Sequence, residues 1–199
     1  MIKRNVLGAG TNVNPLDRMK MILRFAQDVI QMFMAMVKLE NLSKRYLVAL
    51  FFLVFIDYAS KIIALNHIQT LQQNDFLPLI DFLIVFNSGI AFSFLDLNNF
   101  VSRYILLILI FFITLYFFKI FLDEKDNLKK KSLLLIIAGA LGNFIDRLPD
   151  GVVTDFLHFK PFDFSLFIFN FADAYITLGA IIFIFSELIL LKSKNDPKN

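Results

Sequence analysis

The segment YILLILIFFITLYFFKIFL, residues Tyr104–Leu122, decides the fold class of this chain. Its one charged residue is Lys119. A run of about 18 or more apolar residues with few charges is typical of a helix that crosses a membrane, because its length matches the thickness of the hydrocarbon layer. We therefore predict an integral membrane protein.

Three further apolar segments predict three more membrane-spanning helices. They are Tyr46–Leu65, Ser132–Leu148 and Phe171–Leu191. The chain has 199 residues, of which 58% are hydrophobic, whereas ordinary soluble domains hold about 45–50% on a similar count. Four spans leave little chain for a soluble domain, so we expect a membrane fold with an all-α core of four transmembrane helices.

The expected domain organisation follows from these spans. Residues 41–192 should form the four-span domain, and residues 193–199 should form a polar cytoplasmic tail. Residues 1–40 are expected to be an N-terminal extension, either dispensable or an amphipathic helix on the membrane surface, since the apolar pattern of Met19–Glu40 is irregular. Met36 is an alternative start of the chain.

The distribution of Lys and Arg predicts the orientation in the membrane. The connection Asn66–Phe100 holds neither residue type, and Pro149–Asn170 holds only Lys160. Positive charges gather beside the opposite ends of the spans, at Lys38, Lys44, Arg45, Lys125, Lys129, Lys130, Lys131, Lys192, Lys194 and Lys198. Because positive charge marks the cytoplasmic side, both termini should be cytoplasmic and both neutral connections external.

The first external connection contains a short strand signal. Its run Phe82–Phe86 combines β-branched and aromatic residues, which favour strands. We expect this connection to form a small β-sheet, or cradle, at the membrane surface. The second external connection is shorter and rich in Phe.

Carboxylates from separate segments are expected at one depth. Asp57, Asp146 and Asp173 lie about 18, 22 and 28 Å along their helices from the basic cytoplasmic ends, at about 1.5 Å per residue. All three fall in the outer part of the membrane, and Asp155 follows the third span on the same side. A charge inside the membrane costs at least about 2.5–3.5 kcal/mol, so such residues are functional candidates by default.

The third span also carries a patterned helix face. Gly139, Gly142, Asn143 and Asp146 follow i, i+3, i+4, i+7 spacing and therefore share one face. Small residues allow a second helix to approach closely, and polar residues can form hydrogen bonds across the interface. Arg147 lies one turn beyond Asn143.

Structural explanations compete with functional ones for several of these groups. Asp57 and Lys61 are spaced i, i+4 and fit a local ion pair near the surface as well as a functional pair. Asp146 beside Arg147 fits a structural clamp.

The same question arises in the connections. Asn87 and Gly89 fit a plain turn between strands. Asp155 and Asp173 are harder to assign to structure alone, because each lies in an apolar stretch at a membrane boundary.

The composition excludes several chemistries. Without cysteine the chain has no disulfide, no thiolate metal site and no Cys nucleophile. His67 and His158 fall in predicted loops and lack the spacing of metal ligands. No Ser–His or Ser–Lys constellation is evident. We expect no metal and no cofactor, with membrane lipids and no nucleic acid as partners.

Five motifs in chain order resemble the lipoprotein signal peptidase family, signal peptidase II. They are Asp57-Tyr-Ala-Ser-Lys61, Asn87-Ser-Gly-Ile-Ala-Phe92, Gly139-Ala-Leu-Gly-Asn-Phe-Ile-Asp-Arg-Leu148, Gly151-Val-Val-Thr-Asp-Phe156 and Phe169-Asn-Phe-Ala-Asp173. The resemblance covers roughly Met36–Leu191. Each motif alone is weak, whereas five in this order on four spans are specific. Ala138 and Thr154 are mild departures, since many members carry Gly and Val there.

The resemblance implies an aspartyl endopeptidase of the bacterial inner membrane, with its active site near the outer face. Asp155 and Asp173 would form the catalytic pair. The implied substrate is a prolipoprotein whose Cys carries diacylglycerol and which is cut just before that Cys. Substrate-binding residues would be Asn87, Gly89, Asn143, Arg147 and Asn170. Residues supporting the site would be Asp57, Lys61, Gly139, Gly142, Asp146 and Ala172.

Two carboxylates suit peptide hydrolysis without a metal or a covalent intermediate. One takes a proton from water while the other donates a proton to the carbonyl oxygen. The sequence leaves open which Asp is the base, and we expect a monomer.

Two other functions stay open at this point. An ion-coupled small membrane transporter would use buried Asp residues to relay protons. Four spans are few for such a carrier, and no paired broken helices are evident. A non-catalytic membrane subunit is the third alternative.

Overall fold

The computed structural model describes residues 44–71, 79–89 and 100–194, together with the helical residues Lys20, Arg24 and Gln27. Within these ranges the helices are α2 (Lys44–Leu71), α3 (Phe100–Asp123), α4 (Asn127–Arg147) and α5 (Phe171–Lys194). The strands are β1 (Ile80–Asn87), β2 (Val153–Phe159) and β3 (Phe167–Phe169). Each predicted span is therefore a helix, while the proposed 1–40 extension falls almost wholly outside the described residues.

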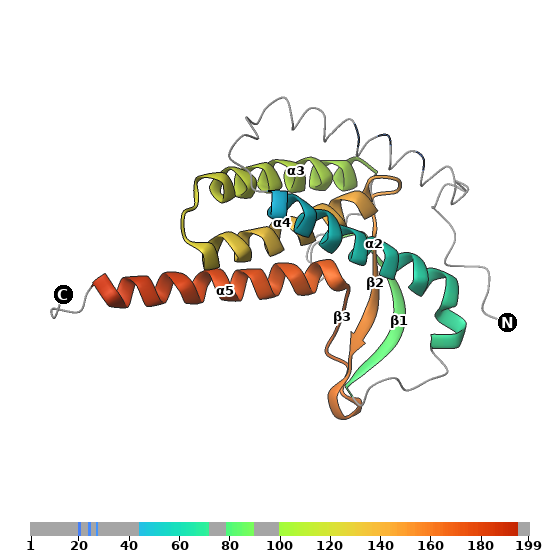
Figure 1. The fold of residues 1–199 in the computed structure, drawn as a ribbon. Helices are drawn as coiled ribbons and strands as arrows, with labels where there is room; N and C mark the ends of the chain where they lie inside the picture. The colour runs from blue at the N-terminus through green and yellow to red at the C-terminus, as the bar shows by residue number, and fades with distance from the viewer. Residues whose placement is uncertain are drawn as a thin grey trace.

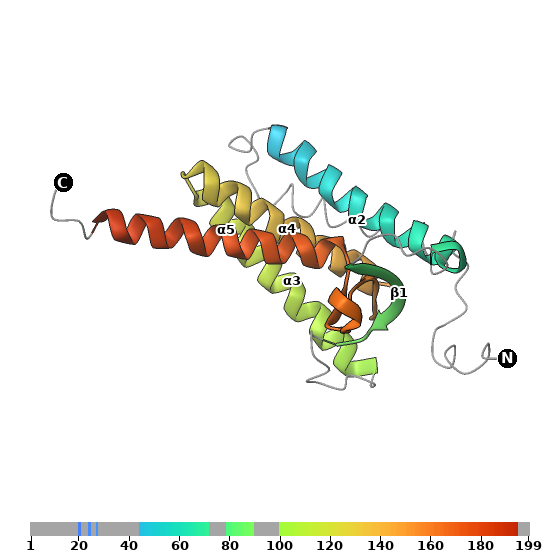
Figure 2. The ribbon, with the colours of Figure 1, turned by 90° about the horizontal axis from the view of Figure 1, so that it is seen from below.

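The helices lie side by side, and the sheet lies at one end of them (Figure 1). The start of α2, the connection between α3 and α4, and the end of α5 all point to the other end. Seen from below, α5 lies over α4, with α2 and α3 to either side (Figure 2). The basic ends of the helices thus lie opposite the sheet, as the charge pattern predicted.

Among the described residues, three helical segments are long and apolar enough to cross a membrane. These segments are Lys44–His67, Arg103–Asp123 and Phe171–Ile189. Their outward side chains, such as Phe51, Phe112 and Ile184, are exposed in the protein alone, which suits contact with lipid. Helix α4 differs because most of its side chains are buried against its neighbours.

An apolar cluster fills the bundle at the end away from the sheet. Its buried side chains are Phe118, Phe121, Leu133, Leu134 and Ile137. Helix α4 begins there at Asn127, after the N-cap Asp126, whose side chain accepts hydrogen bonds from the backbone N–H groups of Leu128 and Lys129, both at 2.9 Å. This N-cap places the helix start five residues before the predicted one, because hydrophobicity alone does not register a polar first turn.

Helices α4 and α5 approach closely because glycine lies between them. A Cβ atom on Gly139 would overlap the carbonyl oxygen of Ala172, and one on Gly179 would lie 2.6 Å from that of Ser132. No larger residue fits either position without moving a backbone. The small-residue face of the third span therefore has the packing role that its pattern predicted.

The sheet is antiparallel with strand order β1-β2-β3. The prediction that the first connection alone forms it is wrong, because β2 and β3 come from the second connection. Strand β2 was not predicted from the sequence because it lacks the alternation of apolar and polar residues that indicates a strand. Its four consecutive residues Val153–Phe156 are all buried. The placement of both histidines in loops is also wrong, since His67 lies in α2 and His158 in β2.

Candidate active site

Strand β2 holds Asp155 in a buried position, where its carboxylate accepts two amide hydrogen bonds. Asn87 of β1 donates from Nδ2 to Oδ2 at 3.0 Å. Asn170, which directly precedes α5, donates from Nδ2 to Oδ1 at 2.6 Å. The sheet pairing explains the first of these hydrogen bonds, because Asn87 and Asp155 lie near each other on adjacent strands.

Asp173 lies in the first turn of α5 and forms a reciprocal cap with Asn170. The side chain of Asn170 accepts the N–H of Asp173 at 2.9 Å, and Asp173 Oδ2 accepts the N–H of Asn170 at 3.3 Å. This capping box satisfies backbone donors that the helix start would otherwise leave without partners. Asn143 of α4 adds a further donor, from Nδ2 to Asp173 Oδ1, at 2.7 Å.

Asn170 therefore joins the two acidic residues. It is completely buried, and one amide group contacts Asp155 through Nδ2 and the backbone of Asp173 through Oδ1. Its Nδ2 also lies 3.2 Å from Asn143 Oδ1. The structure thus brings both predicted acids and all three predicted amides into one hydrogen-bonded cluster.

Asp57 and Lys61 extend this cluster into α2. Lys61 Nζ donates to Asp57 Oδ2 at 2.8 Å and to Asn143 Oδ1 at 3.0 Å. Asp57 Oδ1 accepts the N–H of Ala172 at 2.8 Å. The i, i+4 ion pair is therefore present, but both of its residues are almost inaccessible to solvent in the protein.

Gly142 makes room for this ion pair. A Cβ atom at that position would lie 2.6 Å from Asp57 Oδ2. Gly142 and Asn143, which were predicted to share one face of α4, thus have different roles. The first residue admits the carboxylate of Asp57, and the second accepts a hydrogen bond from Lys61.

Asp146 and Arg147 tie α4 to the sheet. Asp146 Oδ2 accepts the N–H of Thr154 at 2.7 Å and lies 3.6 Å from Lys61 Nζ. Arg147 donates from an Nη atom to the carbonyl oxygen of Gly89 at 3.0 Å. The structural clamp therefore has a physical basis, because Asp146 binds the backbone of β2 and Arg147 binds the backbone just after β1.

The turn after β1 is part of the same arrangement. Asn87 Oδ1 accepts the N–H of Gly89 at 3.0 Å, while its Nδ2 donates to Asp155. Arg147 is buried, and among the described residues its Nε has no hydrogen-bond partner. A buried guanidinium with an N–H still to satisfy can donate to a bound peptide carbonyl.

Burial raises the pKa of Asp155 from 3.8 to about 6, and the negative charge of Asp173 acts in the same direction. Hydrogen bonds from Asn87 and Asn170 favour the ionised form and oppose the increase. Two carboxylates in one site cannot both ionise cheaply. The arrangement therefore favours a state in which one acid is ionised and the other holds a proton, as water activation requires.

One pairing could not be found by sequence reasoning. His158 Nε2 lies 2.7 Å from Ser165 Oγ, so a Ser–His pair does exist. The two residues meet only because the chain reverses between β2 and β3, which spacing alone does not reveal. Ser165 is exposed on that connection, whereas Asp155 is buried.

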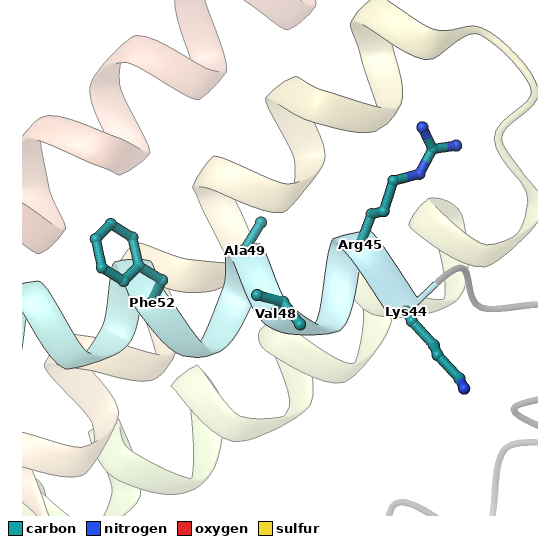
Figure 3. Close-up of a pocket in the computed structure, with 5 residues that line it drawn as sticks. All are labelled: Lys44, Arg45, Val48, Ala49 and Phe52. Atoms are coloured by element: carbon teal, nitrogen blue, oxygen red, sulfur yellow. The ribbon is translucent and has the colours of Figure 1, made fainter.

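A groove of about 440 Å³ opens at the start of α2 (Figure 3). Its lining residues all belong to that helix and include no carboxylate. They are Lys44, Arg45, Val48, Ala49 and Phe52. The groove lies at the helix end opposite the sheet and contributes nothing to the acid cluster (Figures 1 and 3).

The part of the chain that the structure describes has no group of three His, Asp or Glu residues arranged to hold a metal ion. The expectation of a metal-free mechanism stays a prediction, to be tested with chelators.

The chain is similar to a family model, to named bacterial proteins and to solved structures. A family model for signal peptidase (SPase) II matches residues 49–189. The lipoprotein signal peptidase of Buchnera aphidicola is 39% identical over 143 residues, which cover 70% of this chain and 90% of that protein. The lipoprotein signal peptidase of Pelagibacter ubique is 32% identical over 163 residues, covering 80% and 98%. A solved bacterial membrane enzyme has a TM-score of 0.60 at 27% identity, covering 80% of this chain and 94% of that one.

Proposed function

This chain belongs to the signal peptidase II family, and from that premise we propose that it is an aspartic endopeptidase acting on lipid-modified prolipoproteins. Cleavage would fall just before the diacylglyceryl-modified Cys and release the signal peptide. The observation that carries the proposal is the contact of Asn170 with both Asp155 and Asp173. The relatives give no support to the transporter alternative.

The proposed reaction uses the two acids in complementary protonation states. Asp173 accepts hydrogen bonds from Asn143 and from the backbone N–H of Asn170, and it lies at the positive end of α5. Asp155 has the raised pKa and would carry the shared proton. Asp173 would then take a proton from water while Asp155 protonates the carbonyl oxygen of the scissile bond.

The surrounding amides would hold the substrate backbone. Asn87, Asn143 and Asn170 already bind the carboxylates through one side-chain atom each. Gly89 and Arg147 lie at the end of β1, where an extended peptide could meet the guanidinium. Replacing Arg147 by Lys should raise KM more than it lowers kcat, because Lys lacks the planar set of donors.

The proposed topology has four membrane spans. Helix α4 is less apolar than the others, but they cover most of its surface, so its polar face is shielded from lipid. Both termini would be cytoplasmic and the sheet external, in the bacterial inner membrane. Reporter fusions after Lys194 should report cytoplasm, and fusions within Asn66–Phe100 should report the outside. The reverse result would contradict the proposed location of the site.

The domain assignment and the partners follow from this topology. We propose that residues 41–192 form a monomeric peptidase domain, with 1–40 as a dispensable or amphipathic extension and 193–199 as a polar tail. Deleting residues 1–35 should then leave cleavage unchanged. Membrane lipids would surround the spans, and no metal or other cofactor would take part.

Hydrolysis of a synthetic diacylglyceryl-modified lipobox peptide by the purified protein tests the proposal. Cleavage before the modified Cys should proceed unchanged in excess EDTA. Asp155→Asn should stop it, while Asp81→Asn, a matched change on the neighbouring strand, should leave it intact. Cleavage by folded Asp155→Asn, or loss of activity in EDTA that added metal restores, would refute the two-acid mechanism.

A further inference from the structure

The connection between β2 and β3, together with the first residue of β3, carries four exposed apolar side chains, which we call the hairpin tip. The exposed fractions are 94% for Phe162, 68% for Phe164, 48% for Leu166 and 53% for Phe167. Scattered apolar side chains are normal on protein surfaces, but a contiguous group marks a binding surface. Here all four lie within six consecutive residues.

The backbone of the hairpin tip is held in a defined shape. The N–H of Phe164 donates to the carbonyl oxygen of Pro161 at 3.0 Å, and the N–H of Leu166 donates to that of Phe159 at 3.0 Å. Phe162 adopts a left-handed conformation, with φ 52° and ψ 41°. This conformation is rare for a bulky residue, and here it accompanies an almost fully exposed ring.

The position of the hairpin tip relates it to the membrane. The strands run across the direction of α5, so the tip lies beside the bundle and level with the start of that helix (Figure 1). The apolar segment of α5 begins at Phe171. The tip therefore lies at the depth where the membrane boundary meets α5.

We propose that the hairpin tip inserts into the lipid leaflet on the side of the sheet and anchors the sheet to the membrane surface. Aromatic side chains are enriched at the boundary between lipid and water. Beside the tip, Lys160 and Asp81 form a charged pair, with Nζ 3.6 Å from Oδ2. Helix α5 also carries exposed apolar side chains, such as Leu178 and Ile181, which would face the same lipid.

This anchor is independent of peptide hydrolysis. It requires only that α5 crosses the membrane and that the sheet keeps its position relative to that helix. Two other occupants of the apolar surface would behave differently. The signal peptide of a substrate would cover it only when substrate is present, and a second copy of the chain would cover it only at high protein density.

The chain has no tryptophan, so Phe162→Trp creates a single fluorescent reporter. The variant is placed in vesicles of equal parts phosphatidylcholine and phosphatidylglycerol, without substrate, and compared with vesicles whose acyl chains are brominated near the headgroup. We expect blue-shifted emission and strong quenching. Phe112→Trp, on the lipid-facing surface of α3, should be quenched best by bromine deeper in the chains. N-acetyl-tryptophanamide added to the same vesicles gives the emission and quenching of a tryptophan in water.

Water-like emission without quenching would overturn the proposal. Quenching that appears only on adding a lipidated peptide, or that changes with the protein-to-lipid ratio, would overturn it in favour of the substrate or a second copy. Phe164→Trp is a second reporter should Phe162→Trp fail to fold. Adding Phe162→Ser to Phe164→Trp removes a neighbouring anchor, so its quenching should fall.

Discussion

Both halves of α4 are buried, but the first half packs against apolar side chains and the second half forms polar interactions. Leu133, Leu134 and Ile137 in the first half belong to the apolar cluster. Asn143 and Asp146 in the second half bind Lys61, Asp173 or strand backbone through directed polar interactions. Packing in the first half depends on volume and shape, whereas stability in the second depends on each polar group keeping its partner.

Substitutions in the two halves should therefore behave differently. Truncating an apolar side chain in a core leaves a cavity, and stability returns only when the space is refilled. Removing one polar group from a buried cluster leaves its partner without a hydrogen bond or counter-charge, and that cost disappears when the partner is also changed. The two halves of α4 should thus differ in whether a second substitution rescues the first.

The largest expected effect on stability comes from Lys61→Met. It leaves Asp57 as a buried charge without its cation, which should destabilise the protein by about 3–5 kcal/mol. Adding Asp57→Asn should restore much of this stability, because the remaining amide carries no charge. Thermal unfolding of the single and double variants in detergent measures both values.

Leu133→Ala is the matched control in the apolar half. It should cost about 2–5 kcal/mol, and no polar substitution nearby should restore it. If the Asp57→Asn/Lys61→Met protein is no more stable than Lys61→Met, the contrast between the two halves is wrong.

A somewhat smaller effect should depend on pH. Folding raises the pKa of Asp155 from 3.8 to about 6, so the penalty for ionising this buried group is absent below pH 3.8 and complete above pH 6. Two pKa units correspond to about 3 kcal/mol. The parent should therefore lose stability relative to Asp155→Asn as pH rises through this interval.

The apolar half supplies the control for the pH effect. Leu134→Ala should differ from the parent by the same amount at every pH, because no titrating group is removed. Free energies of unfolding measured below pH 3.8 and above pH 6 make the comparison. A pH-independent difference between the parent and Asp155→Asn would contradict the buried environment assigned to Asp155.

The smallest effect concerns the glycines between α4 and α5. Gly139→Ala and Gly179→Ala each add a methyl group where backbone of the facing helix already occupies the space. Overpacking of this kind costs about 1–3 kcal/mol. Only Gly139→Ala should also slow cleavage, because it pushes on Ala172, next to Asp173. Equal cleavage by the two folded variants would show that the α5 start tolerates movement.

The helices could be predicted from sequence because their apolar runs are long. Their ends were less accurate, since α2 continues to Leu71 and α4 begins at Asn127, beyond the apolar runs that defined the predictions. The sheet was predicted only in part. Strand β2 is apolar or buried on both faces, and its pairing with β1 joins segments separated by two helices, which no local pattern reveals.

The residues of the candidate site were easier to predict from the sequence than the hydrogen bonds that join them. Spacing placed Asn143 and Asp146 on one face of α4, and depth placed the acids near one level. The sequence did not reveal that Asn170 contacts both acids or that Lys61 reaches Asn143. These hydrogen bonds depend on side-chain direction after the helices have packed. The pairing of His158 with Ser165 likewise depends on tertiary structure, because a chain reversal brings the two residues together.

The central claim is that Asp155 and Asp173 act as one unit joined by Asn170, and a double-mutant comparison tests it most directly. Cleavage rate per folded protein is measured for Asp155→Asn, Asp173→Asn and the double variant. Each single change should lower the rate by at least about 10²–10⁴-fold, and the double variant should be hardly slower than either, because acids acting together are not additive. Substantial cleavage by a folded single variant, or losses that multiply in the double variant, would contradict the claim.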